Sequence, residues 1–189
     1  MIPQPLSLLL LLGTFPFLTS ATSTTDLSKE ISLNSPSPSS PSFINYVLQT
    51  VNPIRAQHAA APLIWDQTLT AFALQKANGC TLNHTGPYGE NAYWTYYWPP
   101  ETQPNFNVEI ESAFQNWNSQ EEVNAYLAGP EHYLAAAHFT QTVWKATRRI
   151  GCAFSARQCV QNPDQEWWFY CDFWPRGNYK GWYAGNVTV

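Results

Sequence analysis

Four cysteines behind an apolar N-terminal run are the feature that most limits what this chain can fold into. The run ends near Leu18 and is shorter than the roughly 20 residues of a membrane span. The small residues Thr19-Ser20-Ala21 follow it, so we predict a secretory signal peptide over residues 1–21. An even number of cysteines in an exported chain indicates disulfides, with all pairings open, and a zinc site is disfavoured because no C-x-x-C pair is present. The cysteines are Cys80, Cys152, Cys159 and Cys171.

The next segment, residues 22–42, consists largely of Ser, Thr and Pro. Such a composition offers too little apolar surface to offset the chain entropy lost on folding, so we expect a disordered linker, with or without O-linked sugars. The remaining residues, 43–189, are numerous enough for one domain with its own core. The net charge of the chain is −4 and no basic run is present, so nucleic acid is not an expected partner.

Helical periodicity marks parts of this domain. Apolar residues recur at i, i+3, i+4 and i+7 over residues 44–51, after which Asn52-Pro53 predicts a kink or a restart of the helix. Asp66 is placed to cap a second helix that ends at Gly79. Residues 110–117 repeat the same spacing and predict a third helix.

The pattern changes after residue 138. Residues 139–144, 150–155 and 167–173 are rich in aromatic and β-branched side chains, which predicts strands. Alternation along the last two places Cys152 and Cys171 on strand faces that a disulfide could join. Helices packed on both sides of a mainly antiparallel sheet would accommodate these elements, so we predict an α+β domain, a three-layer α-β-α sandwich.

Three short segments resemble the signatures of one secreted family. Residues 137–147 read AHFTQTVWKAT, residues 169–181 read FYCDFWPRGNYKG, and residues 89–91 upstream read GEN. In this order they resemble the CAP superfamily of cysteine-rich secretory proteins, antigen 5 and plant pathogenesis-related proteins of group one, and especially its short secreted fungal members. The resemblance implies the α-β-α sandwich of that family. It also implies the disulfides Cys80–Cys159 and Cys152–Cys171.

The same resemblance implies a cavity lined by two histidines and two acidic residues. His84, Glu90 and His138 match three of these positions. Gln120 stands where the fourth, a glutamate, is usual, and Glu121 follows it, about 100° further around a helix. Glu121 is therefore the candidate replacement. Such a set would hold a divalent cation, zinc before magnesium, whereas the alternative is a satisfied polar network that orders the loop.

No enzyme activity is expected from these residues, and no cofactor is required. A hydrolase would use His84 or His138 as base with Glu90 as its partner. The nearby candidates for a nucleophile, Thr140 and Thr142, have no activating motif, and the chain contains no G-x-S-x-G sequence.

An aromatic segment directly after GEN carries the ligand-binding hypothesis. Its alternation is poor, so we predict a loop, which either packs inward to complete the core or forms a contact surface. In fungal relatives the loop at this place is associated with sterol binding, and flat rings suit a rigid apolar skeleton. The residues are Tyr93, Trp94, Tyr96, Tyr97 and Trp98.

Three further residues complete the expectations. Sequons predict N-linked sugars at Asn83 and Asn186. Arg55 matches part of another family segment and is interpreted as structural, paired with a buried carboxylate.

We expect a secreted, extracellular monomer that binds a sterol, a fatty acid or another small hydrophobic molecule, in lipid export or at a host surface. The alternatives left open have no lipid role. They are a divalent-metal-binding module and a protein-interaction module, such as an effector that contacts a host or cell-surface protein.

Overall fold

The computed structural model describes residues 34–97, 103–129, 132–159 and 166–189. The predicted signal peptide, and the predicted linker as far as residue 33, lie outside this part. The first helix begins at Pro41, ahead of the predicted domain boundary at residue 43, and Asn34 already forms a β-bridge with Arg157. None of the helices within these ranges has the length and apolar character needed to cross a membrane.

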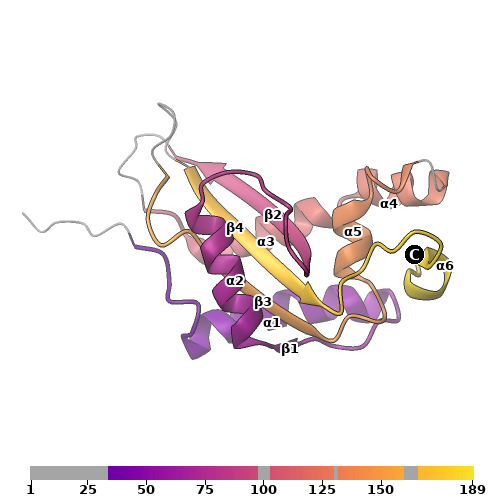
Figure 1. Cartoon of the computed structure of the whole chain (residues 1–189), viewed down its shortest axis with the longest axis horizontal. Coiled ribbons are helices and arrows are strands. Elements are labelled where there is room, and N and C mark those ends of the chain that lie inside the picture. The colour runs from indigo at the N-terminus through magenta and orange to yellow at the C-terminus, as the bar shows by residue number, and fades with distance from the viewer. Residues whose placement is uncertain (1–33, 98–102, 130–131, 160–165) are drawn as a thin grey trace, which may run out of the picture. The chain divides into compact units, whose positions relative to one another are not determined.

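A four-stranded sheet forms the middle layer (Figure 1). Its strand order is β1-β3-β4-β2; β1 and β3 run parallel, and the other neighbours run antiparallel. The mainly antiparallel sheet is therefore confirmed, with one parallel pair that makes it a mixed sheet. β2 forms the edge opposite to β1. The strands are β1 (Ile64–Trp65), β2 (Gly89–Tyr96), β3 (Arg149–Phe154) and β4 (Glu166–Trp174).

Helices cover both faces of this sheet, which confirms the three-layer sandwich (Figure 1). The helix α2 (Gln67–Asn78) packs on one face, and Asp66 caps it as predicted, since its carboxylate accepts from the N–H groups of Thr68 and Leu69. The helices α1 (Pro41–Gln57) and α3 (Phe106–Trp117) pack on the other face. Large buried side chains fill that layer, and each stabilises the fold by about 1.5–3 kcal/mol. They include Phe43, Val47, Ile110, Phe114, Ile150 and Phe169.

Both disulfides implied by the resemblance are confirmed. Cys152 and Cys171 are direct partners in the β3–β4 register and are joined. Cys80, just after α2, is joined to Cys159, beyond β3. The bridged pairs are 19 and 79 residues apart in sequence. Because each disulfide lowers the entropy of the unfolded chain, each should stabilise the fold by about 3–4.5 kcal/mol.

One predicted strand is a helix. Residues 137–142 form a short helix, α5 (Ala137–Thr142), in place of the strand predicted over 139–144. Phe139 and Val143 share one side of this helical segment and are buried together with Trp144 and Val187, so tertiary packing overrides the strand propensity of the sequence. At Pro53 the sequence predicted a kink or a restart, and α1 is one helix there without a restart. The proline lies on the exposed side of the helix, where the carbonyl that loses its partner can be hydrated.

Arg55, in the last turn of α1, is fully buried and donates hydrogen bonds to backbone carbonyls. The acceptors are the carbonyl oxygens of Ala61 (from Nε, 2.8 Å), Thr142 (from Nη1, 2.7 Å), Trp144 (from Nη1, 3.1 Å) and Thr147 (from Nη2, 3.0 Å). The interpretation of Arg55 as structural is therefore supported, but its partners are carbonyls and not the predicted carboxylate. Burial, together with the charge of Arg148, lowers the pKa of Arg55 to about 10, so it remains charged at neutral pH.

The replacement Arg55→Met should lower the free energy of unfolding by about 3–5 kcal/mol, because buried carbonyls lose their charged donor. Urea denaturation followed by tryptophan fluorescence measures this loss. Arg149→Met is the matched control, since Arg149 is half exposed and contacts Asp66 at 3.3 Å, an interaction worth at most about 1 kcal/mol. Equal losses in the two variants would contradict the role given to Arg55.

Candidate functional site

A cavity of about 810 Å³ lies beside the edge strand β2. One side is formed by β2 and the turn that precedes it. The other side is formed by α5, by the residues just before it, and by the C-terminal segment around residues 176–183. The predicted site residues His84, Glu90 and His138 all line this cavity.

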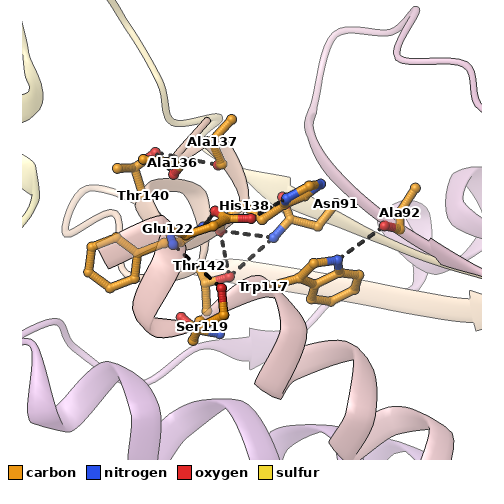
Figure 2. A network of polar contacts seen from close by, with 12 residues as sticks. Asn91, Ala92, Trp117, Ser119, Glu122, Ala136, Ala137, His138, Thr140 and Thr142 are labelled. Atoms are coloured by element: carbon orange, nitrogen blue, oxygen red, sulfur yellow. Dashed lines mark hydrogen bonds and ion pairs between the residues drawn. The ribbon is translucent and has the colours of Figure 1, made fainter. Parts of the chain in front are cut away.

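His138 is held by a glutamate, but not by the predicted one. Its Nδ1 lies 2.6 Å from Oε1 of Glu122, and Oε2 of Glu122 accepts from the backbone N–H of Phe139 at 2.8 Å (Figure 2). Glu121 is exposed and Gln120 bonds to Asn124 on the surface. The prediction that Glu121 fills the vacant acidic position is therefore wrong.

The local sequence explains why Glu122 points inward. Ser119 caps the helix α4 (Gln120–Ala128), and its hydroxyl accepts from the N–H of Glu122. Glu122 is thus the third residue of the helix, the position of the glutamate in an S-x-x-E capping box. The sequence Ser119-Gln120-Glu121-Glu122 was the signal that could have identified it. Here the carboxylate bonds α5 instead of the cap residue.

The rest of the His138 environment is a closed polar network (Figure 2). Asn91 donates from Nδ2 to the carbonyl of His138 and to the hydroxyl of Thr142, both at 3.1 Å. The indole of Trp117 stacks on the His138 ring and donates to the carbonyl of Ala92 at 3.1 Å. Because Nδ1 is engaged by Glu122, Nε2 is the ring nitrogen that remains for a ligand.

The second histidine belongs to a separate pair. Nδ1 of His84 lies 3.3 Å from Oε2 of Glu90, and Nζ of Lys76 lies 3.3 Å from Oε1 of the same glutamate. Lys76 also donates to the carbonyls of Asn83 and Thr85, at 2.9 and 2.5 Å, which holds the turn against α2. The ammonium of Lys76 offsets the negative charge of Glu90 and so opposes cation binding there. Among the described residues, no group of three or more His, Cys, Asp or Glu side chains is placed to hold a metal ion.

The two threonines considered as nucleophiles are buried and engaged with backbone. Thr140 donates to the carbonyl of Ala136 at 2.9 Å and lies 2.6 Å from Oδ1 of Asn178. Thr142 donates to the carbonyl of His138 at 2.8 Å. Both hydroxyls therefore have structural roles in the turn and the helix that border the cavity.

Residues 93–96 of the aromatic segment belong to the strand β2, so the prediction of a loop is wrong for these residues. Tyr93 packs on the α1–α3 side of the sheet and, like Tyr97, donates its hydroxyl to the buried Glu109. Trp94 stacks on Trp168 at 5.1 Å and is 44% exposed. Alternation was hidden because both faces of β2 carry aromatic rings. Tyr93 and Trp94 line the cavity, Tyr96 is 67% exposed, and Trp98 lies outside the described residues.

The two sequons lie in different environments. Asn83 is exposed, between Leu82 and His84 of the cavity lining, and its Oδ1 accepts from the N–H of Thr85 at 2.9 Å. Asn186 is buried at the end of the short helix α6 (Tyr183–Asn186). Its amide accepts from Ala146 at 3.0 Å and donates to Trp182 at 2.9 Å. A sugar on Asn186 would be attached to the buried Nδ2 that donates to Trp182, whereas a sugar on the exposed Asn83 does not disturb the core.

Asp172 is a wholly buried carboxyl group beside the site. It is the direct partner of Glu90 in the β2–β4 register, and neither of its oxygens has a hydrogen-bond partner within the described part of the chain. Burial, and to a lesser extent the negative charge of Glu90, raises the pKa of Asp172 to about 8, although Lys76 partly opposes this. Asp172 is therefore largely protonated at neutral pH.

This carboxyl group makes the fold less stable as the pH rises. Its pKa in the folded protein is about 8, above the value of about 3.9 in the unfolded chain. Between these two values the folded state holds a proton that the unfolded state has lost. The free energy of unfolding therefore falls by about 1.4 kcal/mol per pH unit from about pH 4 toward pH 8. Asp172→Asn should remove this loss. Urea unfolding at pH 5 and pH 8 should show a stability advantage of the variant over the parent that grows with pH. Glu121→Gln, at an exposed carboxylate, should show no such growth, and the same slope for parent and Asp172→Asn would refute the assignment.

Comparison with known proteins agrees with this geometry. The model of the cysteine-rich secretory protein family, CAP, matches residues 48–173. Fruiting body protein SC14 of Schizophyllum commune is 35% identical over 157 residues, which cover 76% of this chain and 68% of that protein. Pathogenesis-related protein PR-1 of Medicago truncatula is 34% identical over 147 residues, which cover 74% of this chain and 78% of that protein.

Solved structures show the same fold. BmVAL-1 aligns over 74% of this chain and 80% of its own, with a TM-score of 0.58 and 21% identity. At this level of identity the likeness concerns the fold alone. The conserved architecture, the two disulfides and the sequence match together place the chain in the cysteine-rich secretory protein family, CAP.

Proposed function

We propose that this protein binds a sterol or a similar small hydrophobic molecule outside the cell, in the cavity beside β2. The observation that carries the proposal is the cavity itself. Its volume of about 810 Å³ lies within the range of about 300–1,000 Å³ that is typical of sites for small molecules.

The lining suits a ligand that is mostly apolar and carries one polar group. Aromatic and aliphatic side chains contribute on both sides of the cavity. Polar side chains lie between them, and several, such as Glu90, Asn91 and His138, are already held by ion pairs or hydrogen bonds. The apolar lining residues include Leu82, Tyr88, Trp94, Tyr133, Leu134 and Tyr183. His84 and His138 can each offer a ring nitrogen to a hydroxyl, which would orient a rigid skeleton against the rings.

An extracellular location is supported by two features of the chain. All four cysteines are oxidised in two disulfides, which persist in oxidising compartments. The matching family is described as secretory. A ligand taken up outside the cell is consistent with lipid export or with activity at a host surface.

A divalent-metal site is less well supported by the same geometry. The two histidines are each paired with a different carboxylate, and Lys76 supplies a positive charge to one of these pairs. A metal ion would have to displace that ammonium before Glu90 could serve as a ligand.

Trp94 and Tyr96 form a matched pair for testing the proposal, because they lie on the same face of β2 but only Trp94 lines the cavity. Trp94→Ala should weaken the binding of a fluorescent sterol about 10- to 100-fold, as expected for about 1.5–3 kcal/mol of lost apolar contact. Tyr96→Ala should leave affinity unchanged. Fluorescence titration measures both, and thermal melts verify that each variant is folded.

Two results would contradict the proposed function. If the parent protein shows no saturable sterol binding, or if both variants bind as the parent does, the cavity is not a sterol site.

A further inference from the structure

Large apolar side chains are exposed at the mouth of the cavity. Leu134 is 89% exposed, Trp182 68% and Tyr179 51%. They extend from the two segments that form the side of the cavity opposite β2, since Leu134 itself and Tyr183, next to Trp182, line the cavity. We call Leu134, Tyr179 and Trp182, together with Arg176 and Lys180, the rim surface.

The rim surface rests on a packed aromatic base. The rings of Tyr133 and Tyr183 are 4.1 Å apart, and Tyr183 packs edge-on against the buried Trp144 at 5.3 Å. Tyr126 of α4 stacks on Tyr133 at 5.1 Å. The exposed side chains therefore extend from a firmly packed region, and their exposure is not the result of a loosely held segment.

Charge distinguishes the C-terminal part of this surface from the rest of the chain. The net charge of the protein is −4, yet residues 174–189 contain Arg176 and Lys180 and no Asp or Glu. Arg176 lies over the ring of Tyr179 at 5.9 Å, and it also lines the cavity. Aromatic, aliphatic and basic side chains therefore occur together at one mouth.

This combination fits the surface of a lipid bilayer that carries anionic headgroups. Trp and Tyr are the residues that concentrate at the boundary between hydrocarbon and headgroups, and Lys and Arg are attracted by anionic lipids. A polysaccharide fits less well, because Leu134, the most exposed of these side chains, offers no flat ring on which a sugar could stack.

We propose that the rim surface docks on an anionic membrane surface, so that the mouth of the cavity faces the lipid from which its ligand comes. The statement that the ligand comes from the membrane rests on the proposed function, whereas the docking of the rim surface does not. Leu134 and Trp182 would insert at the headgroup level, and Arg176 and Lys180 would contact lipid phosphates.

Flotation with lipid vesicles tests the docking directly. The protein recovered from the culture medium of expressing cells is mixed with sterol-free vesicles of phosphatidylcholine and phosphatidylserine. We expect it to float with these vesicles and to bind less well at high salt or to vesicles of phosphatidylcholine alone. The double variant Leu134→Asp/Trp182→Asp should partition at least about tenfold less.

The matched control is Ile64→Asp. Ile64 is 62% exposed and lies on β1, at the other edge of the sheet, so this change should leave flotation unaltered. Both altered side chains of the double variant are exposed, and its thermal melt should match that of the parent.

Three results would overturn the docking. They are a parent protein that does not float, a double variant that floats as the parent does, and an Ile64→Asp variant that loses flotation to the same extent. Retention on insoluble chitin or β-glucan that is lost in the double variant, without flotation of the parent, would reassign the surface to polysaccharide.

Sterol titration in solution separates this proposal from the proposed function. If the protein binds sterol but does not float with vesicles, the docking proposal is refuted and the proposed function stands. If it floats but does not bind sterol, the docking proposal is supported and the proposed function is refuted.

Discussion

One buried side chain, Arg55, joins the helical layer to the elements that carry the site. Its guanidinium bonds the carbonyls of Thr142 and Trp144, at the end of α5, from the last turn of α1. A charged group at the centre of a domain is stable only when its donors are satisfied. Here they are satisfied by carbonyls that α5 leaves unpaired at its C-terminal end. The helix α5, which carries His138, is thus positioned by a residue that does not line the cavity.

The two histidine–carboxylate pairs line the cavity and also hold neighbouring elements of the fold together. Glu122 ties the start of α4 to the start of α5, through both His138 and the N–H of Phe139. Glu90 ties the turn before β2 to α2 through Lys76. Since each carboxylate already has a cationic or N–H partner, the polar residues form an ordered network, and the apolar walls remain as the surface that a ligand can bury.

Asp172 adds a neutral acid to this arrangement. A protonated carboxyl group can donate one hydrogen bond as well as accept. Because Asp172 lies across from Glu90 and is largely neutral at neutral pH, it adds no second negative charge to this part of the β2–β4 pair. A wholly buried carboxyl group is therefore compatible with the fold at this position.

Much of this could be predicted from the sequence because the signals are local. Helical spacing located α1, α2 and α3, alternation located β3 and β4, and the family resemblance implied the disulfides and matched His84, Glu90 and His138 to cavity positions. Two features were missed because they depend on neighbours that are distant in sequence. A short segment rich in Phe and Thr becomes the helix α5 when one side is buried, and β2 carries rings on both faces and so shows no polar side. Glu122 was missed although the capping-box pattern that begins at Ser119 marks it locally.

The sequence by itself determined the family and the layers, since these follow from periodicity and from matching motifs; through the family resemblance it also implied the disulfide pairing and the approach of His84, Glu90 and His138 to the cavity. Only the tertiary structure decided which glutamate holds His138, that Lys76 shares Glu90, and that Trp94 lines the cavity while Tyr97 does not. These outcomes depend on a rotation of about 100° per residue in a helix and on a change of face at each residue in a strand. A shift of one position therefore exchanges an exposed side chain for one in the site.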